Sequence, residues 1–194
     1  MNVVLIGPPG AGKGTQAARV AITRRVPQIS TGDILRQSVA SNSLLGLTVK
    51  DAMSRGELVS DEIMTDLIAE RLTENDCEHG FVLDGFPRTI EQALALDVLM
   101  EERGPLAVIE LAVPDDELVR RLSARRVIER RTDDREAVVR ERLRVYHKST
   151  RPLIDFYRTR GTLMTVAGHL TEDAVSERIT KAIDSIFAKE EHYT

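Results

Sequence analysis

The chain has 194 residues, of which 42% are apolar and 30% are charged, as in a soluble globular protein of about one domain. Its net charge of -4 argues against a general nucleic-acid-binding protein, which usually carries a basic excess. The single cysteine, Cys77, excludes an intramolecular disulfide and a four-cysteine zinc site. The N-terminus carries no basic region and only a short apolar run, so we expect neither a signal peptide nor a membrane span, and we expect a cytoplasmic protein.

Strand-like and helix-like segments alternate along the chain, which predicts an α/β fold with a parallel sheet and helices on both faces. Apolar runs predict strands over residues 3–6, 27–29, 81–83, 108–113 and 163–166. Helices are expected after residue 15, after the cap-like sequence Ser60-Asp61-Glu62, and from about residue 171. No internal repeat, low-complexity tract or long linker interrupts this pattern.

The first predicted strand is followed by the sequence G-P-P-G-A-G-K-G-T at residues 7–15. Glycines let consecutive backbone N–H groups approach phosphate oxygens, and the helix that follows directs its positive end to the same place. Lys13 can then reach the β- and γ-phosphates, and the Thr15 hydroxyl can bind Mg2+. Because Gly14 separates these two residues, the motif departs from the common G-K-[ST] ending at its metal-binding position. The spacing favours a phosphate-binding loop over a glycine-rich turn with a solvated lysine.

Two further motifs lie at the ends of the second and third predicted strands. Residues 30–36, S-T-G-D-I-L-R, would by themselves indicate a turn and a helix cap, with Arg36 exposed to solvent. Residues 81–88, F-V-L-D-G-F-P-R, form an apolar strand that ends in a carboxylate. Beside a phosphate loop, Asp84 suits Mg2+ binding, directly or through water, and Arg88 offers a guanidinium fork for phosphate.

Residues 120–144 contain ten arginines, five acids and no lysine, so they carry a strong local positive charge. A charge run of this kind is usually the solvated face of a helix. Asp133 and Asp134 interrupt it and admit two interpretations. In the first, they contact a nucleotide-bearing flap or orient arginines. In the second, Asp133 and Glu136 form a helix cap, and the sequence does not decide between the two interpretations.

Together these motifs resemble those of the adenylate kinases, in the nucleoside monophosphate kinase family. G-P-P-G-A-G-K-G-T, S-T-G-D-I-L-R, D-G-F-P-R-T-I-E-Q and R-x-D-D lie in the family's order across nearly the whole chain. The family's own loop carries G-K-G-T, so the position of Gly14 agrees with it. The resemblance implies a P-loop three-layer α/β fold with a central parallel five-stranded sheet flanked by helices. It also implies reversible phosphoryl transfer from Mg-ATP to AMP, giving two ADP, for adenine nucleotide homeostasis.

The resemblance also implies one P-loop kinase domain with two mobile parts. The core comprises residues 1–29, 60–121 and 135–194, the NMP-binding flap residues 30–59, and the lid residues 122–134. Closure of both parts over the nucleotides would exclude water from the reaction. Only a few residues separate Arg125 from Arg131, so we expect the short lid without structural zinc. We also expect a monomer.

Site residues follow from the resemblance, position by position. The catalytic residues would be Lys13, Arg88, Arg121, Arg125, Arg131 and Arg142. ATP would bind to Gly10, Ala11, Gly12, Lys13, Gly14, Thr15, Arg121, Arg125 and Leu170. AMP would bind to Thr31, Arg36, Glu57, Leu58, Val59, Gly85, Arg88, Gln92, Arg131 and Arg142. Mg2+ would be held through Thr15 and Asp84, with water between. Arg126 and Arg130 lie next to Arg125 and Arg131 in the sequence, so either member of each pair fits the family position.

Three alternatives remain open. Gln92 either reads the adenine edge of AMP or closes a capping box that begins at Thr89. The protein could be a uridylate or cytidylate kinase, although such kinases usually have alanine where Thr31 stands and differ at Gln92. From another class, a P-loop regulatory protein could bind nucleic acid through its arginines. That protein would show no AMP-dependent ADP formation, and its binding to polynucleotide would depend steeply on salt.

Overall fold

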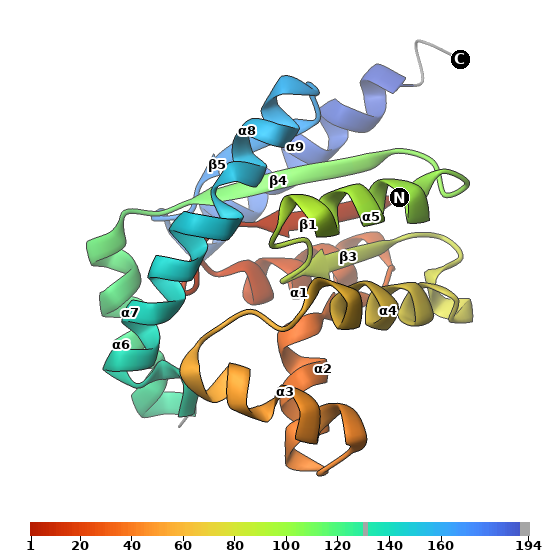
Figure 1. Cartoon of the computed structure of the whole chain (residues 1–194). Helices are drawn as coiled ribbons and strands as arrows, with labels where there is room; N and C mark the ends of the chain where they lie inside the picture. The colour runs from red at the N-terminus through yellow and green to blue at the C-terminus, as the bar shows by residue number, and fades with distance from the viewer. Residues whose placement is uncertain (130–131, 191–194) are drawn as a thin grey trace.

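A five-stranded parallel sheet lies at the centre of the computed structural model, which describes residues 1–129 and 132–190 (Figure 1). The spatial order of the strands is β2-β3-β1-β4-β5. Their bounds are Asn2–Ile6 (β1), Gln28–Ser30 (β2), Phe81–Asp84 (β3), Leu106–Ala112 (β4) and Leu163–Ala167 (β5). The five predicted strands and the parallel sheet are therefore confirmed. Strands β2 and β3 lie on one side of β1 and strands β4 and β5 on the other, so the direction in which strands are added changes beside β1. In open α/β sheets, ligands bind at the carboxyl ends of the strands next to such a reversal.

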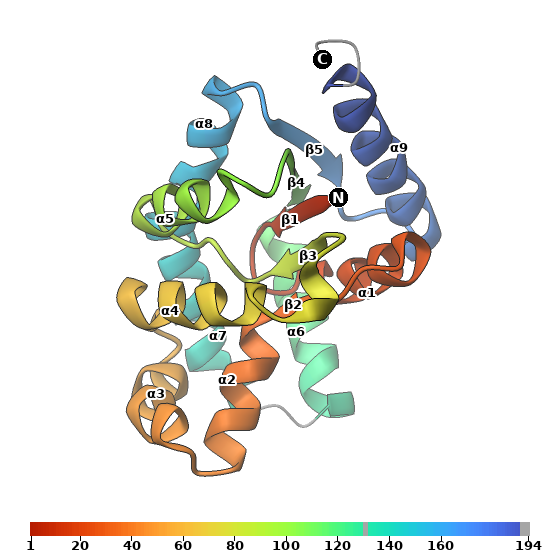
Figure 2. The ribbon, with the colours of Figure 1, turned by 90° about the vertical axis from the view of Figure 1, so that its right-hand side faces the viewer.

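Helices cover both faces of the sheet in the described ranges (Figure 2). Their bounds are Lys13–Arg24 (α1), Thr31–Ala40 (α2), Leu44–Arg55 (α3), Asp61–Leu72 (α4), Ile90–Met100 (α5), Asp115–Glu129 (α6), Glu136–Val145 (α7), Pro152–Thr159 (α8) and Glu172–Glu190 (α9). A π-helix, Tyr146–Thr150, joins α7 to α8. The cap predicted at Ser60 is confirmed, since its side chain accepts from the Ile63 N–H. None of the described helices is long and apolar enough to cross a membrane.

Alternating side chains along each strand supply two separate cores. On one face, Val4, Ile6 and Leu83 pack with α4, α5 and α8. On the other face, Val3, Leu5 and other buried residues pack with α1 and α9. Such buried runs are typical of strands in a parallel sheet that helices cover on both sides. The sheet is therefore a rigid frame whose carboxyl edge carries the loops that follow β1, β2 and β3.

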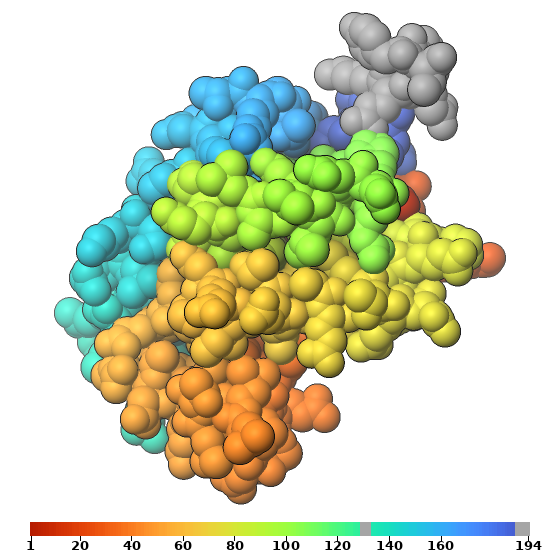
Figure 3. All heavy atoms as spheres, turned by 45° about the vertical axis from the view of Figure 1, so that its right-hand side comes forward, coloured from red at the N-terminus to blue at the C-terminus, as the bar shows by residue number. Residues whose placement is uncertain are grey.

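Helices α2 and α3 form a lobe that projects from this frame, shown in orange in Figure 3. Their backbones approach closely at Gly46, where an added Cβ would lie 2.0 Å from the Ser38 carbonyl oxygen. Ser43 caps α3 and accepts from the Gly46 N–H at 3.1 Å. Only glycine fits at this crossing without a shift of the backbone.

Gly46→Ala is therefore expected to destabilise the protein by about 1–3 kcal/mol through overpacking. Helix propensity alone predicts the opposite sign, because alanine normally stabilises a helix interior by up to about 1 kcal/mol relative to glycine. Urea unfolding of the mutant and parent measures the difference. An unchanged or raised midpoint would show that the two helices can separate without cost.

Candidate active site

The phosphate loop connects β1 to α1 at the carboxyl edge of the sheet. Gly12 is the N-cap of α1 at a φ of +91°, a backbone conformation that favours glycine. A Cβ added there would meet no atom within 4 Å, so the loop faces open space. The N-terminus of α1 points into this space with its first N–H groups and its positive dipole, as an anion-binding site requires.

Lys13 begins α1, and its side chain turns back over the loop. Its Nζ donates to the carbonyl oxygens of Gly7 at 2.8 Å and Pro8 at 3.0 Å. Burial lowers the pKa of Lys13 to about 8, and Asp84 partly opposes this shift. The neighbouring cations Arg88, Arg142 and Arg125 lower the pKa further. A bound anion would relieve this crowding of positive charge.

A cleft of about 580 Å³ opens in front of the loop. It is lined by all of the residues predicted to bind ATP, namely Gly10, Ala11, Gly12, Lys13, Gly14, Thr15, Arg121, Arg125 and Leu170. Arg125 faces the cleft, whereas its neighbour Arg126 is exposed to solvent and does not line it. The geometry therefore separates two arginines that the sequence motif leaves in competition. Arg130 and Arg131 lie outside the described residues.

A smaller pocket of about 70 Å³ adjoins the cleft beneath α2 and α3. Eight residues predicted to bind AMP line it: Thr31, Arg36, Glu57, Leu58, Val59, Arg88, Gln92 and Arg142. Gly85 lines the larger cleft instead. Met53 and Met64 also line the pocket, and no sequence motif marked them. Arg36, Arg88 and Arg142 line both cavities, so they stand where the two meet.

Asp84 ends β3 and lines the larger cleft together with Thr15. An added Cβ at Gly14 would lie 3.3 Å from Oδ2 of Asp84, which gives a steric reason for the small residue between Lys13 and Thr15. No group of three or more His, Cys, Asp or Glu side chains in the described ranges is arranged to hold a metal ion. One carboxylate and one hydroxyl suit Mg2+, which usually keeps several waters and binds the phosphates of a substrate. The residues present therefore fit Mg-ATP.

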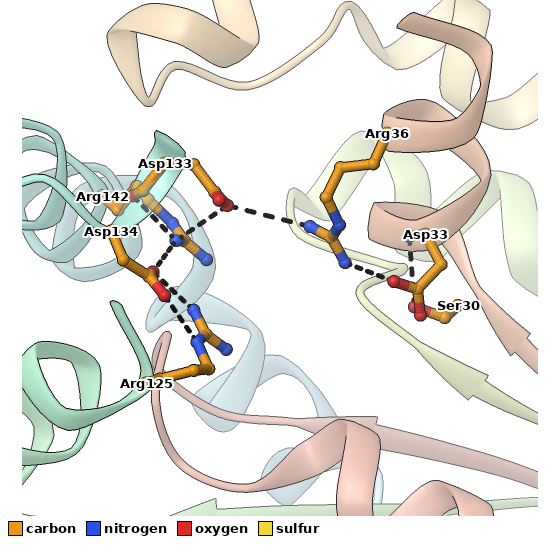
Figure 4. Close-up of polar contacts among 7 residues, drawn as sticks. All are labelled: Ser30, Asp33, Arg36, Arg125, Asp133, Asp134 and Arg142. Carbon is orange, nitrogen blue, oxygen red and sulfur yellow. Dashed lines mark hydrogen bonds and ion pairs between the residues drawn. The ribbon is translucent and has the colours of Figure 1, made fainter. Parts of the chain in front are cut away.

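Arg125 and Arg142 are held by one buried carboxylate (Figure 4). Asp134 accepts from Nε and Nη2 of Arg125, both at 2.6 Å, and from Nη1 of Arg142 at 3.0 Å. Its side chain is fully buried, so these bonds compensate a charge that would otherwise be costly to bury. Burial also lowers the pKa of Arg142 to about 10.

Asp133 connects this pair to α2. It lies 3.1 Å from Nη1 of Arg142 and 3.7 Å from Nη1 of Arg36, and Arg36 also donates to Asp33 at 2.6 Å. Asp133 and Asp134 therefore orient arginines, as one sequence interpretation expected. The alternative helix cap is wrong, because the N-cap of α7 is Arg135 and no side chain caps this helix.

Arg88 is fixed without a carboxylate. Its Nε donates to the Gly85 carbonyl at 2.7 Å, and its own carbonyl accepts from the Thr150 hydroxyl at 3.0 Å. Within the described part of the chain, neither Nη group of Arg88 has a hydrogen-bond or ion-pair partner. Burial lowers the pKa of Arg88. A phosphate oxygen would satisfy these donors directly.

Arg121 lies at the other end of the cleft. Its Nη1 donates to the Gly168 carbonyl at 2.9 Å and its Nε to Glu117 at 2.6 Å. Hydrogen bonds from Arg120 and Arg121 hold the pKa of Glu117 down at about 2. The side chain of Arg121 thus joins α6 to the segment after β5 that contains Leu170.

Gln92 is buried with 1% of its surface exposed. Its backbone N–H donates to the Thr89 hydroxyl at 3.1 Å, so the predicted helix cap is present. Its side chain does not close the box at Thr89. Instead Oε1 accepts from the Arg88 N–H at 2.7 Å and Nε2 donates to Asp61 at 2.7 Å. The sequence motif gave no sign of this contact, because it joins residues of two helices that are 31 positions apart in the chain.

Comparisons with known proteins agree with this geometry. A family model described as adenylate kinase matches residues 5–162. Adenylate kinases of Archaeoglobus fulgidus and Methanosarcina barkeri are 44% and 45% identical, over 97% of this chain and 99% and 100% of their own. An adenylate kinase of Xanthomonas campestris pv. campestris (strain 8004) is 51% identical, over 94% of this chain and 99% of its own. Because the model covers most of the chain and these relatives match it nearly from end to end, the chain belongs to the adenylate kinase family.

Proposed function

We propose that this protein transfers the terminal phosphoryl group of Mg-ATP reversibly to AMP, giving two ADP, and so maintains adenine nucleotide balance. One observation carries the proposal. Two adjoining cavities share Arg36, Arg88 and Arg142 at their junction, and the phosphate loop with Lys13 lines the larger one. Two nucleotides bound in these cavities would place their phosphates against the same cations.

The chemistry needs positioning and charge compensation rather than a general base. The phosphate of AMP is already anionic and acts as the nucleophile. Lys13 and the arginines of the cleft align the two phosphates and neutralise the negative charge that spreads over the group in transit. Arg36 and Arg88 hold the acceptor phosphate, while Lys13, Arg121 and Arg125 hold the donor.

Thr15 and Asp84 would hold Mg2+, the aspartate through water. The bound ion neutralises charge on the phosphate oxygens of ATP. Thr15 is exposed at the start of α1 and Asp84 ends the neighbouring strand, so both can reach a nucleotide on the loop.

We propose that residues 30–59 and 122–134 move relative to the core. The pocket under α2 and α3 measures about 70 Å³, well below the roughly 300 Å³ usual for small-molecule sites, so this lobe has to shift to admit AMP. Closure would then exclude water that could otherwise accept the phosphoryl group. Leu122, the first residue of the proposed lid, is fully buried, and a Cβ on Gly10 would lie 2.9 Å from its Cγ, so we propose that it is the hinge about which the rest of the lid moves.

We also propose a cytoplasmic monomer. Both cavities are formed by a single chain, so the site is complete without a second copy. The only cysteine is buried and unpaired, which suits a reducing compartment.

A coupled assay of ADP formation across AMP, GMP, CMP, UMP and their deoxy forms tests the function. We expect AMP to be the best acceptor. Preference for UMP or CMP would assign the chain to pyrimidine nucleotides. No AMP-dependent ADP formation, together with salt-sensitive binding to a polynucleotide, would favour the nucleic-acid-binding alternative.

Gln92→Ala tests whether this residue reads the base. If it does, the mutant leaves a buried base edge unpaired and loses roughly 1–3 kcal/mol of AMP binding, with a smaller loss for CMP. If Gln92 serves only to connect helices, the melting temperature falls while the ratio of AMP to CMP efficiency stays fixed. Steady-state kinetics and thermal unfolding on the same preparation separate the two results.

A further inference from the structure

The amide of Gln92 is held by two partners of opposite hydrogen-bonding character. Asp61 Oδ1 accepts from Nε2 at 2.7 Å, and the backbone N–H of Arg88 donates to Oε1 at 2.7 Å. A carboxylate can only accept and a backbone N–H can only donate. These two contacts therefore fix which end of the amide is oxygen and which is nitrogen. Rotation of the amide by 180° would place Oε1 against the carboxylate of Asp61.

This fixed orientation matters for the base that the pocket accepts. A carboxamide has two N–H donors and two acceptor lone pairs, so one of each remains after these contacts. The 6-aminopurine edge of adenine offers an acceptor at N1 beside a donor at the 6-amino group. A 6-oxopurine offers the reverse, a donor at N1 beside an acceptor at O6. A freely rotating amide could match either edge, but a locked amide matches one.

We propose that Asp61 is a positioning residue that sets the base selectivity of the AMP site. By holding Nε2 of Gln92, it keeps the amide in the orientation that complements a 6-aminopurine and opposes a 6-oxopurine. This inference rests on the proposed function, because it takes Gln92 as the residue that faces the base.

The local structure supports a dedicated role for Asp61. It is the first residue of α4 and also accepts from the Thr89 hydroxyl at 3.0 Å, so one carboxylate joins the start of α4 to the start of α5. Gln92 and Thr89 are its partners, and Gln92 lines the pocket. Glu62 is next in the same helical turn but is exposed to solvent. Selectivity thus depends on a side chain that need not touch the nucleotide.

Asp61→Asn tests the proposal with AMP and IMP as acceptors. IMP is the informative probe, because it differs from AMP only at the 6-position and N1. In the mutant, an asparagine N–H can face Oε1 of a rotated Gln92, so rotation no longer sets an oxygen against a carboxylate. Its remaining cost lies at Arg88, whose backbone N–H would then face Nε2. We expect the ratio of kcat/KM for AMP to that for IMP to fall about tenfold, mainly through KM, since one hydrogen bond is worth about that factor.

Glu62→Gln is the matched control, because it removes the same charge from the same helical turn without a contact to Gln92. We expect its ratio of AMP to IMP efficiency to equal that of the parent. Melting temperatures of both mutants separate loss of stability from loss of selectivity. Asp61→Glu retains a carboxylate, and we expect it to keep more of the parental ratio than Asp61→Asn does.

The proposal is overturned if Asp61→Asn lowers the efficiency with AMP and IMP by the same factor, since Asp61 would then be only structural. That result is distinct from failure of the proposed function, which would appear as a parent enzyme with no AMP-dependent ADP formation. It is also distinct from failure of the role of Gln92. In that case Gln92→Ala would leave the ratio of AMP to IMP efficiency unchanged as well.

Discussion

Lys13→Ala is expected to lose nearly all turnover and to keep its fold. The side chain lies over the phosphate loop, among Asp84 and three arginines, where a charge on the transferred group would develop. Removing one such charged donor from an active site typically costs about 3–4 kcal/mol of transition-state stabilisation, which is roughly 100-fold or more in kcat. The measurement is kcat in the coupled assay with both nucleotides saturating.

Folding of this mutant is expected to remain normal. Burial lowers the pKa of Lys13 to about 8, so the charged ammonium costs folding free energy, and this cost is fully present below about pH 8. Removing the ammonium therefore does not weaken the core. Lys181→Ala on α9 is the control, since this exposed side chain pairs with Glu177 and lies outside the cleft. Near-parental turnover in Lys13→Ala would contradict the mechanism based on the phosphate loop.

Arg88→Ala is expected to weaken AMP binding by roughly 10- to 100-fold while ATP binding changes little. Arg88 lines both cavities, and a charge-assisted hydrogen bond to phosphate is worth about 1.5–3 kcal/mol. Arg36→Ala should show a smaller loss, because Arg36 is already paired with Asp33. Calorimetric titration with AMP measures both effects.

Two arginines of α6 serve as controls for that experiment. Arg125→Ala is expected to lower turnover with both substrates saturating, because it lines the donor cleft. Arg126→Ala should resemble the parent, because this neighbouring arginine is exposed outside the cleft. An unchanged AMP affinity in both Arg88→Ala and Arg36→Ala would remove these two arginines from the acceptor site.

The sequence predicted the parts of this protein that depend on short-range patterns. The strands are buried apolar runs, and the phosphate loop is a set of glycines and one lysine at fixed spacing, so both could be located along the chain. The same holds for Asp84, which ends a strand, and for Arg88, which follows that strand by a few residues. Local patterns also gave the cap at Thr89, but they could not give the second use of the Gln92 side chain.

What could not be predicted depends on packing between distant segments. Arg125 and Arg126 are adjacent and chemically identical, and only the orientation of α6 puts the first in the cleft. Asp61 binds a residue of another helix, and Met53 and Met64 line a pocket because α3 and α4 converge there. Asp133 fitted a helix cap with Glu136 equally well, and the positions of three arginines settled the role of Asp133 and Asp134.

The buried carboxylate of Asp134 has a consequence for the thermodynamics of binding. A long arginine side chain that becomes immobile on binding a ligand loses conformational entropy worth about 0.5–1.5 kcal/mol. Arg125 and Arg142 are held by Asp134 through contacts within the chain itself, so most of that entropy is lost when the protein folds. The nucleotide therefore meets cations that are already in place, and more of its interaction energy remains for aligning the reacting phosphates.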